Sequence, residues 1–110
     1  MKKTLESEAL KEEGRPEWWW WLSFADPSKP KGTQFLGALV IKAPGMATAL
    51  LRAHRNGTNP GGAVEGFPVQ TDEAIALKVL EEVSGKLMSK AECDAFDARL
   101  EALRAEANGR

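Results

Sequence analysis

The densest apolar stretch of the chain is Trp18–Ala25, which lies between Pro16 and Pro27. In an extended conformation its even-numbered side chains point to one face and its odd-numbered side chains to the other, so each face carries two indoles. As a helix the same stretch would be ringed by indoles, which only a fully buried helix tolerates. The pattern therefore predicts a strand over about residues 17–25 that needs cover on both faces.

Two other segments are typical of strands, and a helical pattern lies between them. Residues 33–42 and 63–69 are short, largely apolar and bounded by turn residues, and Pro68 favours an edge position for the later one. Residues 44–56 place apolar side chains at the spacing of an amphipathic helix, at Met46, Ala49, Leu50 and Ala53. We expect the strand order 2-1-3, with the tryptophan strand in the centre because it alone is strongly apolar on both faces.

Two helices are predicted to complete the chain. Thr71 can cap the first, over about residues 72–84, and the Ser89–Glu92 segment has the form of a capping box that opens the second, over about residues 90–107. The second helix carries a narrow apolar stripe that consists of Cys93, Phe96, Leu100, Leu103 and Ala107. The stripe favours a helix that docks on its own domain, with a short coiled-coil contact as the alternative.

Together these elements predict a two-layer α+β fold in which helices cover one face of a three-stranded sheet. Residues 16–110 form a single domain, and residues 1–15 form a flexible or helical N-terminal arm. An open sheet face would leave two indoles uncovered, and a second copy of the chain is the simplest cover for them. We therefore expect a homo-oligomer, a dimer or larger, with an interface made by Trp19, Trp21, Phe96, Leu100 and Leu103.

Charged residues are distributed unevenly along the chain. The net charge is −1, with nine Lys/Arg against six Asp/Glu in residues 1–55 and six against ten in residues 56–110. A near-neutral chain does not hold nucleic acid mainly by its phosphates, so we expect no nucleic acid partner. The single cysteine, the acidic residues that follow Met1-Lys2-Lys3 and the lack of an apolar run of membrane-spanning length predict a cytoplasmic protein with no membrane partner.

Residues suited to catalysis are few. The chain has one histidine, His54, and one cysteine, Cys93, with no tyrosine and no HExxH, CxxC or phosphate-binding glycine motif. We therefore expect no catalytic residues, no metal site, no cofactor and a non-enzymatic role, with a small enzyme that uses His54 as the alternative. Cys93 is predicted to be structural and inert, because it belongs to the apolar stripe of the last helix.

The constellation most typical of a binding site begins on the central helix. Arg52, His54 and Arg55 are followed by Asn59-Pro60-Gly61-Gly62, whose glycines can aim backbone N–H groups into one concavity beside the cations. This pattern predicts an anion-binding nest formed by Arg52, His54, Arg55, Asn59, Gly61 and Gly62. The alternative is a helix C-cap and a type II turn beside solvated arginines.

Four motifs resemble a family of short uncharacterised proteins found in phages, prophages and bacterial genomes. The motifs are Trp21-Leu22-Ser23-Phe24-Ala25-Asp26-Pro27, Gln34-Phe35-Leu36-Gly37, Ala53-His54-Arg55 and Asn59-Pro60-Gly61-Gly62, and the resemblance covers about residues 18–70. It implies an accessory or anti-defence protein that works by binding. The expected ligand is an anionic small molecule such as a nucleotide signal. The alternative partner is a host protein, blocked through an exposed aromatic face or the C-terminal helix.

Overall fold

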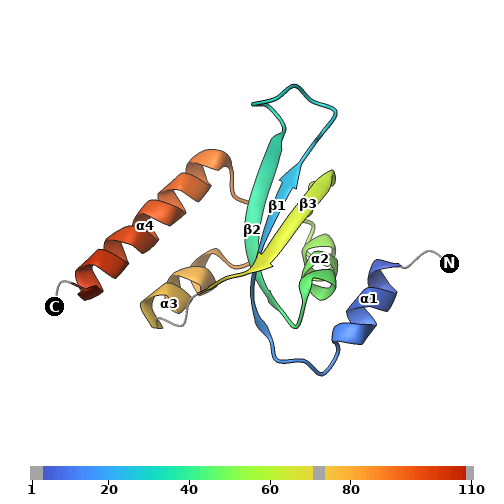
Figure 1. Ribbon diagram of the computed structural model, residues 1–110, viewed down its shortest axis with the longest axis horizontal. Helices are drawn as coiled ribbons and strands as arrows, with labels where there is room; N and C mark the ends of the chain where they lie inside the picture. The colour runs from blue at the N-terminus through green and yellow to red at the C-terminus, as the bar shows by residue number, and fades with distance from the viewer. Residues whose placement is uncertain (1–3, 71–73, 109–110) are drawn as a thin grey trace.

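A computed structural model describes residues 4–70 and 74–108 of the chain (Figure 1). The elements run in the order α1 (Leu5–Glu12), β1 (Trp18–Ala25), β2 (Phe35–Ala43), α2 (Met46–Arg55), β3 (Ala63–Pro68), α3 (Ala74–Val83) and α4 (Lys90–Asn108). The α+β class and the expected strands and helices are confirmed. Thr71 and residues 72–73, where the sequence predicts a cap and the start of a helix, lie outside the described residues.

The three strands form one antiparallel sheet in the order β2-β1-β3, as predicted. β1 is central and pairs with both neighbours, so that Trp21 lies opposite Val40 of β2 on one side and Phe67 of β3 on the other. β2 and β3 therefore run in the same direction, and α2 forms the crossover between them. The tryptophan strand lies in the middle because this position covers both of its edges as well as both of its faces.

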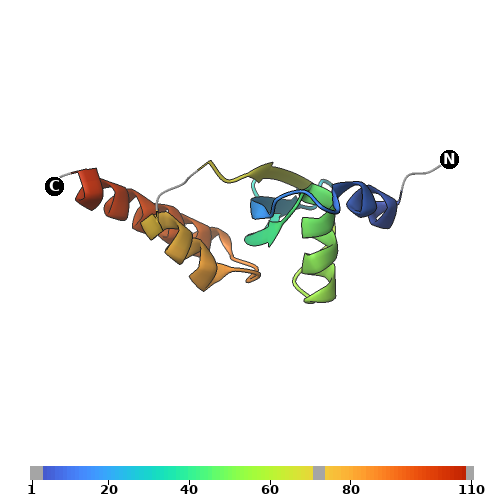
Figure 2. The ribbon, with the colours of Figure 1, turned by 90° about the horizontal axis from the view of Figure 1, so that it is seen from below.

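Helices pack against both faces of the sheet, so the expectation of one open face is wrong. Leu22 and Phe24 form a buried cluster with α2, whereas Trp19 and Val40 belong to a separate cluster with α3 and α4. Neighbouring residues of a strand point to opposite faces, which places the two clusters on opposite sides of the sheet. Figure 1 and Figure 2 both show α3 and α4 on one side of the strands and α1 and α2 on the other.

The five residues expected at an oligomer interface contribute to the chain's own core. Trp19 is only 5% exposed, and Phe96 and Leu100 are buried in the same cluster. Trp21 and Leu103 are partly buried and pack against that cluster, where the rings of Trp21 and Phe96 lie 5.8 Å apart. α3 and α4 supply the cover that we assigned to a second copy, so the indoles no longer argue for an oligomer.

The connection between α3 and α4 closes the outer edge of β2. The backbone N–H of Ala38 donates to the carbonyl oxygen of Met88 at 3.0 Å, and the N–H of Met88 donates back at 2.7 Å. The N–H of Gly85 also donates to the carbonyl oxygen of Val40 at 2.8 Å. These bonds satisfy part of the free ladder of β2 and anchor the two C-terminal helices to the sheet.

The N-terminal segment forms a helix, α1, that lies against α2 (Figure 1). A capping box opens its first turn. At its other end, the carboxylate of Glu12 accepts hydrogen bonds from the backbone N–H groups of Ala47 and Thr48, at 3.1 and 2.8 Å. These are unsatisfied donors at the start of α2, where the N-cap residue Gly45 has no side chain to bind them. Glu12 therefore caps α2 from another helix.

The Glu12 cap depends on glycine at position 45, and a pair of variants tests this. A Cβ at Gly45 would overlap the Glu12 carboxylate, so Gly45→Ala should lower the free energy of unfolding by about 1–2 kcal/mol, as loss of a helix cap does. Glu12→Ala should cost about the same, and the double variant should lose little more than either single variant. Urea denaturation measures the three losses. Additive losses would contradict the shared cap.

The same cap predicts a pH dependence. Burial by itself raises the pKa of Glu12, but the hydrogen bonds from Thr48 and Ala47 outweigh it and hold the pKa below its ordinary value of 4.5. A carboxyl group with a lowered folded-state pKa stabilises the fold above its unfolded-state pKa, and this contribution is lost as pH falls through the folded-state value. The stability difference between the native protein and Glu12→Ala should therefore shrink as the pH falls below 4.5.

Candidate functional site

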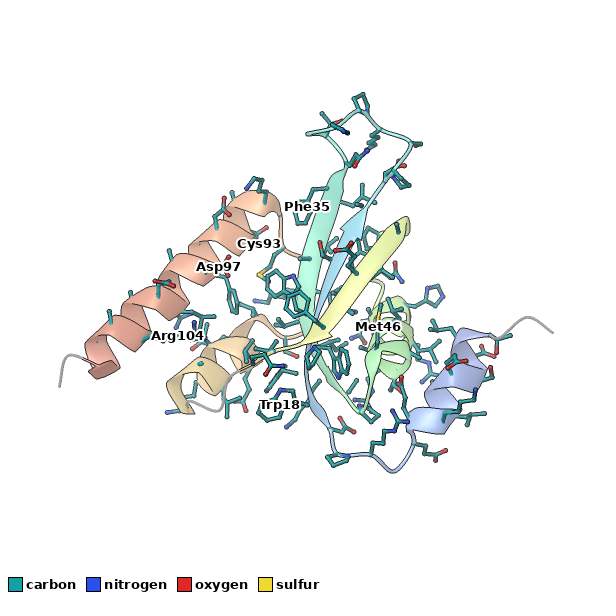
Figure 3. All side chains as sticks on the ribbon, viewed as in Figure 1. Trp18, Phe35, Met46, Cys93, Asp97 and Arg104 are labelled. Carbon is teal, nitrogen blue, oxygen red and sulfur yellow. The ribbon has the colours of Figure 1, made fainter. Side chains whose placement is uncertain are left out.

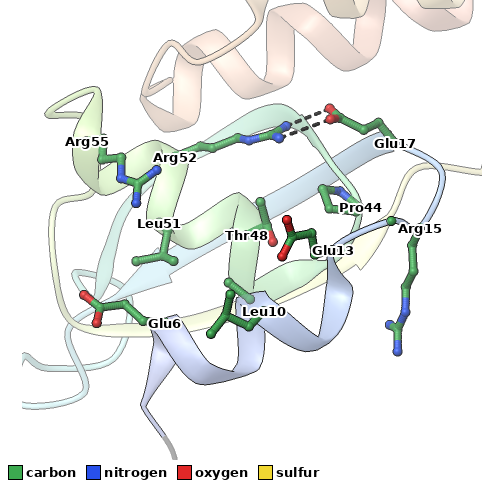
Figure 4. A pocket seen from close by; sticks show the side chains of 12 residues that line it. Glu6, Leu10, Glu13, Arg15, Glu17, Pro44, Thr48, Leu51, Arg52 and Arg55 are labelled. Atoms are coloured by element: carbon green, nitrogen blue, oxygen red, sulfur yellow. Dashed lines mark hydrogen bonds and ion pairs between the residues drawn. The ribbon is translucent and has the colours of Figure 1, made fainter.

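A groove between α1 and α2 is the candidate site (Figure 4). The two helices run antiparallel, because Glu12 holds the end of α1 at the start of α2. The groove has a volume of about 490 Å³ and is lined by α1, by the turn that follows it and by one side of α2. This volume lies within the range of about 300–1,000 Å³ that is usual for small-molecule sites.

Arg52 lines the groove, but its guanidinium is already bound. Its two terminal nitrogens donate to the two carboxylate oxygens of Glu17 at 2.7 and 3.1 Å, and one of them also donates to the carbonyl oxygen of Lys42 at 2.6 Å. The hydrogen bond between the two side chains is the main cause of a raised pKa for Arg52 and of a lowered pKa for Glu17. Arg52 thus ties α2 to the start of β1 and to β2.

Two other arginines in the groove, Arg15 and Arg55, are not bound in this way. Within residues 4–70 and 74–108, no hydrogen bond or ion pair engages either side chain. Figure 4 shows the two guanidinium groups at opposite ends of the groove. Glu6 and Glu13 also line it, so the site offers both cationic groups and hydrogen-bond acceptors.

The part of the groove between these arginines is apolar. Leu10 of α1 is 68% exposed, and Leu51 of α2 is half-buried beside it. Ala9 and Pro44 add further apolar surface, and Thr48 contributes a hydroxyl group. A large aliphatic side chain that is this exposed within a concave surface leaves apolar area that a bound molecule can cover.

The residues predicted to form one binding nest are separated in the structure. Arg52 and Arg55 line the α1–α2 groove, whereas His54 and Asn59 line a second hollow of about 410 Å³ together with Thr4 at the start of α1. Helix positions three apart share a face, whereas positions one or two apart do not face each other, and His54 is two positions from Arg52 and one from Arg55. For this reason His54 points away from the two arginines that flank it in the sequence.

Gly61 and Gly62 have the contacts of a turn. The side-chain oxygen of Asn59 accepts the backbone N–H of Gly61 at 2.8 Å, and Gly62 lies directly against the carbonyl oxygen of Ala25. Both glycines have positive φ angles, 86° and 76°. Neither lines the α1–α2 groove. The turn alternative therefore accounts for both glycines without a ligand.

Cys93 is buried on α4, in the position that the apolar stripe predicts (Figure 3). Its thiol donates a weak hydrogen bond to the carbonyl oxygen of Met88 at 3.9 Å. Burial is the main cause of a raised pKa for this thiol, and the nearby carboxylates of Asp97, Asp94 and Glu92 raise it further. A thiol in this environment is a poor nucleophile.

Comparison of the chain with protein-family models, with curated proteins and with solved structures gives no match. Among the side chains that the structure describes, no group of three or more His, Cys, Asp or Glu residues could hold a metal ion. None of the described helices is both long enough and apolar enough to cross a bilayer. The geometry and charges of the groove are the basis for a functional assignment.

Sequence reasoning missed the half of the groove that α1 contributes, including Leu10 and Arg15. The contact that was not predicted is the Glu12 cap, which holds α1 against α2. One signal was present in the sequence. The helix that begins at Met46 has a glycine N-cap and no acidic residue in its first turn, so its N–H groups need an acceptor from elsewhere in the chain.

Proposed function

We propose that this protein is a non-catalytic binding protein that holds an anionic small molecule, such as a nucleotide signal, in the α1–α2 groove. One observation carries the proposal: among the described residues no hydrogen bond or ion pair engages the guanidinium groups of Arg15 and Arg55, which stand at the ends of an apolar groove. Arginine is the side chain best suited to phosphate, because its planar fork matches two phosphate oxygens at once.

The other groups in the groove fit the rest of such a ligand. Leu10 and Leu51 offer an apolar surface for a base, and Glu6 and Glu13 offer acceptors for hydroxyl or amino groups. A ligand that carries both phosphate and hydrogen-bond donors uses both signs of charge in the groove, whereas a simple anion would be repelled by the two glutamates. These features favour a nucleotide over inorganic phosphate.

The proposal also includes a role for the protein in the cell. A protein of this kind, with the phage-type motifs, would act in the cytoplasm as an accessory or anti-defence protein that sequesters a nucleotide signal. Assembly into an oligomer is not needed, because the groove is built from one chain.

Arg55→Ala tests the proposal in a thermal-shift screen over mononucleotides, dinucleotides and phosphorylated metabolites. A ligand present at 100 times its Kd stabilises the folded state by about 2.7 kcal/mol. Loss of one charged hydrogen-bond donor should weaken binding at least about ten-fold, so Arg55→Ala should reduce the stabilisation by about half. Arg15→Ala should act in the same direction.

Lys31→Ala is the matched control, since it removes an exposed cation in the β1–β2 loop, which does not line the groove. Arg52→Ala is less informative, because it also removes the tie between α2 and β1 and destabilises the free protein. If no compound in the screen raises the melting temperature at millimolar concentration, the anionic ligand is ruled out.

Two other functions make different predictions. An enzyme that uses His54 would consume a compound, and turnover would be lost in His54→Ala. His54 is exposed in the second hollow, apart from the arginines.

A protein-interaction module would show no ligand in the screen. The observation that favours it is the open edge of the sheet at β3.

A further inference from the structure

The two outer edges of the sheet differ in their backbone pairing. The α3–α4 connection pairs with the outer edge of β2 through Ala38, Val40, Gly85 and Met88. Within the described residues, no strand or bridge pairs with the outer edge of β3. β3 is six residues long, so it presents a short free ladder of backbone donors and acceptors.

The register shows which backbone groups are free. The N–H of Val69 donates to the carbonyl oxygen of Trp19 at 2.9 Å, and in an antiparallel pair every second residue bonds to the same neighbour. Phe67 and Glu65 therefore turn their backbone groups toward β1. Val64 and Gly66 turn theirs outward, and Pro68 adds an outward carbonyl group without an N–H. The free edge thus offers donors at Val64 and Gly66.

The side chains beside this edge include one acidic and one aromatic residue that a partner can contact. Glu65 and Phe67 lie on the same side of β3 as each other, and both are exposed, Phe67 by 54%. On the opposite side, Gly66 packs closely against Leu22 of β1 and Met46 of α2. An added strand would therefore meet a carboxylate and an aromatic ring on one side.

A second copy of the chain fits this edge poorly. Antiparallel pairing of two β3 strands about Glu65 places the two carboxylates opposite each other, and pairing about Gly66 places Phe67 opposite Glu65. Pairing about Phe67 brings the two rings together, but it places Pro68, which has no N–H, opposite Gly66. Of these three registers, the first opposes like charges, and the other two place Pro68, which has no N–H, opposite Val64 or Gly66.

We infer that the open edge of β3 binds an extended segment of a partner protein, with a basic residue opposite Glu65 and an apolar residue opposite Phe67. The segment adds a fourth strand to the sheet, its main chain bonds to Val64 and Gly66, and its side chains provide the specificity. The net charge of −4 over residues 56–110, six Lys/Arg against ten Asp/Glu, also favours a basic partner.

A synthetic peptide tests this inference without knowledge of the partner. The probe is acetyl-Thr-Ile-Val-Lys-Val-Thr-amide, which places Ile opposite Phe67 and Lys opposite Glu65 in the antiparallel register. The control peptides replace Lys with Glu, or the central Val with Pro. At saturating probe, amide hydrogen exchange at Val64 and Gly66 should slow at least about ten-fold, while the amides of Glu65 and Phe67, already turned toward β1, should change little.

A charge exchange provides the matched variant. Binding measured by NMR titration should be about five-fold weaker for the Glu peptide, from the cross-strand charge pair alone. The exposed variant Glu65→Lys should reverse this preference and leave the fold intact. Binding without protection of Val64 and Gly66 would overturn the inference, as would protection of these amides by self-association in the absence of peptide. Failure here leaves the α1–α2 groove untouched, because the two surfaces share no residue.

Discussion

Replacing Trp19 with alanine should lower the free energy of unfolding by about 3–5 kcal/mol, the usual cost of removing a large buried aromatic side chain. Trp19 is only 5% exposed and lies in the cluster that joins the sheet to α3 and α4, with Leu80 and Phe96 among its members. The Nζ of Lys42 also lies 5.8 Å from the centre of its ring. The loss combines the burial free energy of the indole atoms that are removed with the cost of the cavity that they leave behind.

Trp18→Ala is the matched control for this prediction. Trp18 is 37% exposed, and its indole N–H donates to the carbonyl oxygen of Val69 at 2.7 Å, so its removal should cost about 1 kcal/mol. Urea denaturation at two protein concentrations ten-fold apart measures both variants and the native protein. A midpoint that rises with concentration would show that association contributes to stability, and that burial within one subunit does not explain the loss.

The strand order was predictable because the tryptophan strand is apolar on both faces, which only a central strand with two covered faces satisfies. The placement of the helices was not. An apolar stripe such as Cys93, Phe96 and Leu100 shows that a helix has a buried side, but it does not show which face of the sheet that side meets. In the structure the stripe packs with Trp19 and Val40, and the backbone bonds of Ala38 to Met88 anchor the helices beside β2. Backbone bonds of this kind leave no trace in the side-chain pattern.

The candidate site was predictable in part. The spacing of Arg52 and Arg55 places them on one helix face, and the structure places both in the groove. The same helical geometry separates His54 from them, so the division of the predicted nest could have been foreseen. The pairing of Arg52 with Glu17 could not have been foreseen, because it depends on the position of the segment that precedes β1. Long-range contacts of this kind decide which of two neighbouring arginines keeps its charge available.

Gly62→Ala should be the most damaging change in the Asn59–Gly62 segment, with a loss of about 3 kcal/mol or more in the free energy of unfolding. Gly62 has a φ of 76°, a conformation that costs an alanine about 1–2 kcal/mol. A Cβ there would also overlap the carbonyl oxygen of Ala25, a backbone atom that cannot turn aside. Relief would require β3 to move away from the end of β1, which breaks ladder bonds.

Gly61→Ala separates this effect from the backbone conformation alone. Gly61 has a φ of 86°, but a Cβ there meets no atom within 4 Å, so the expected loss is only about 1–2 kcal/mol. Thermal and urea denaturation of the two variants measure the difference. If the glycines formed an anion-binding nest instead of a turn, both variants would weaken ligand binding alike. A clear excess loss for Gly62→Ala, with ligand binding at the α1–α2 groove retained in Gly61→Ala, would establish that the segment positions β3.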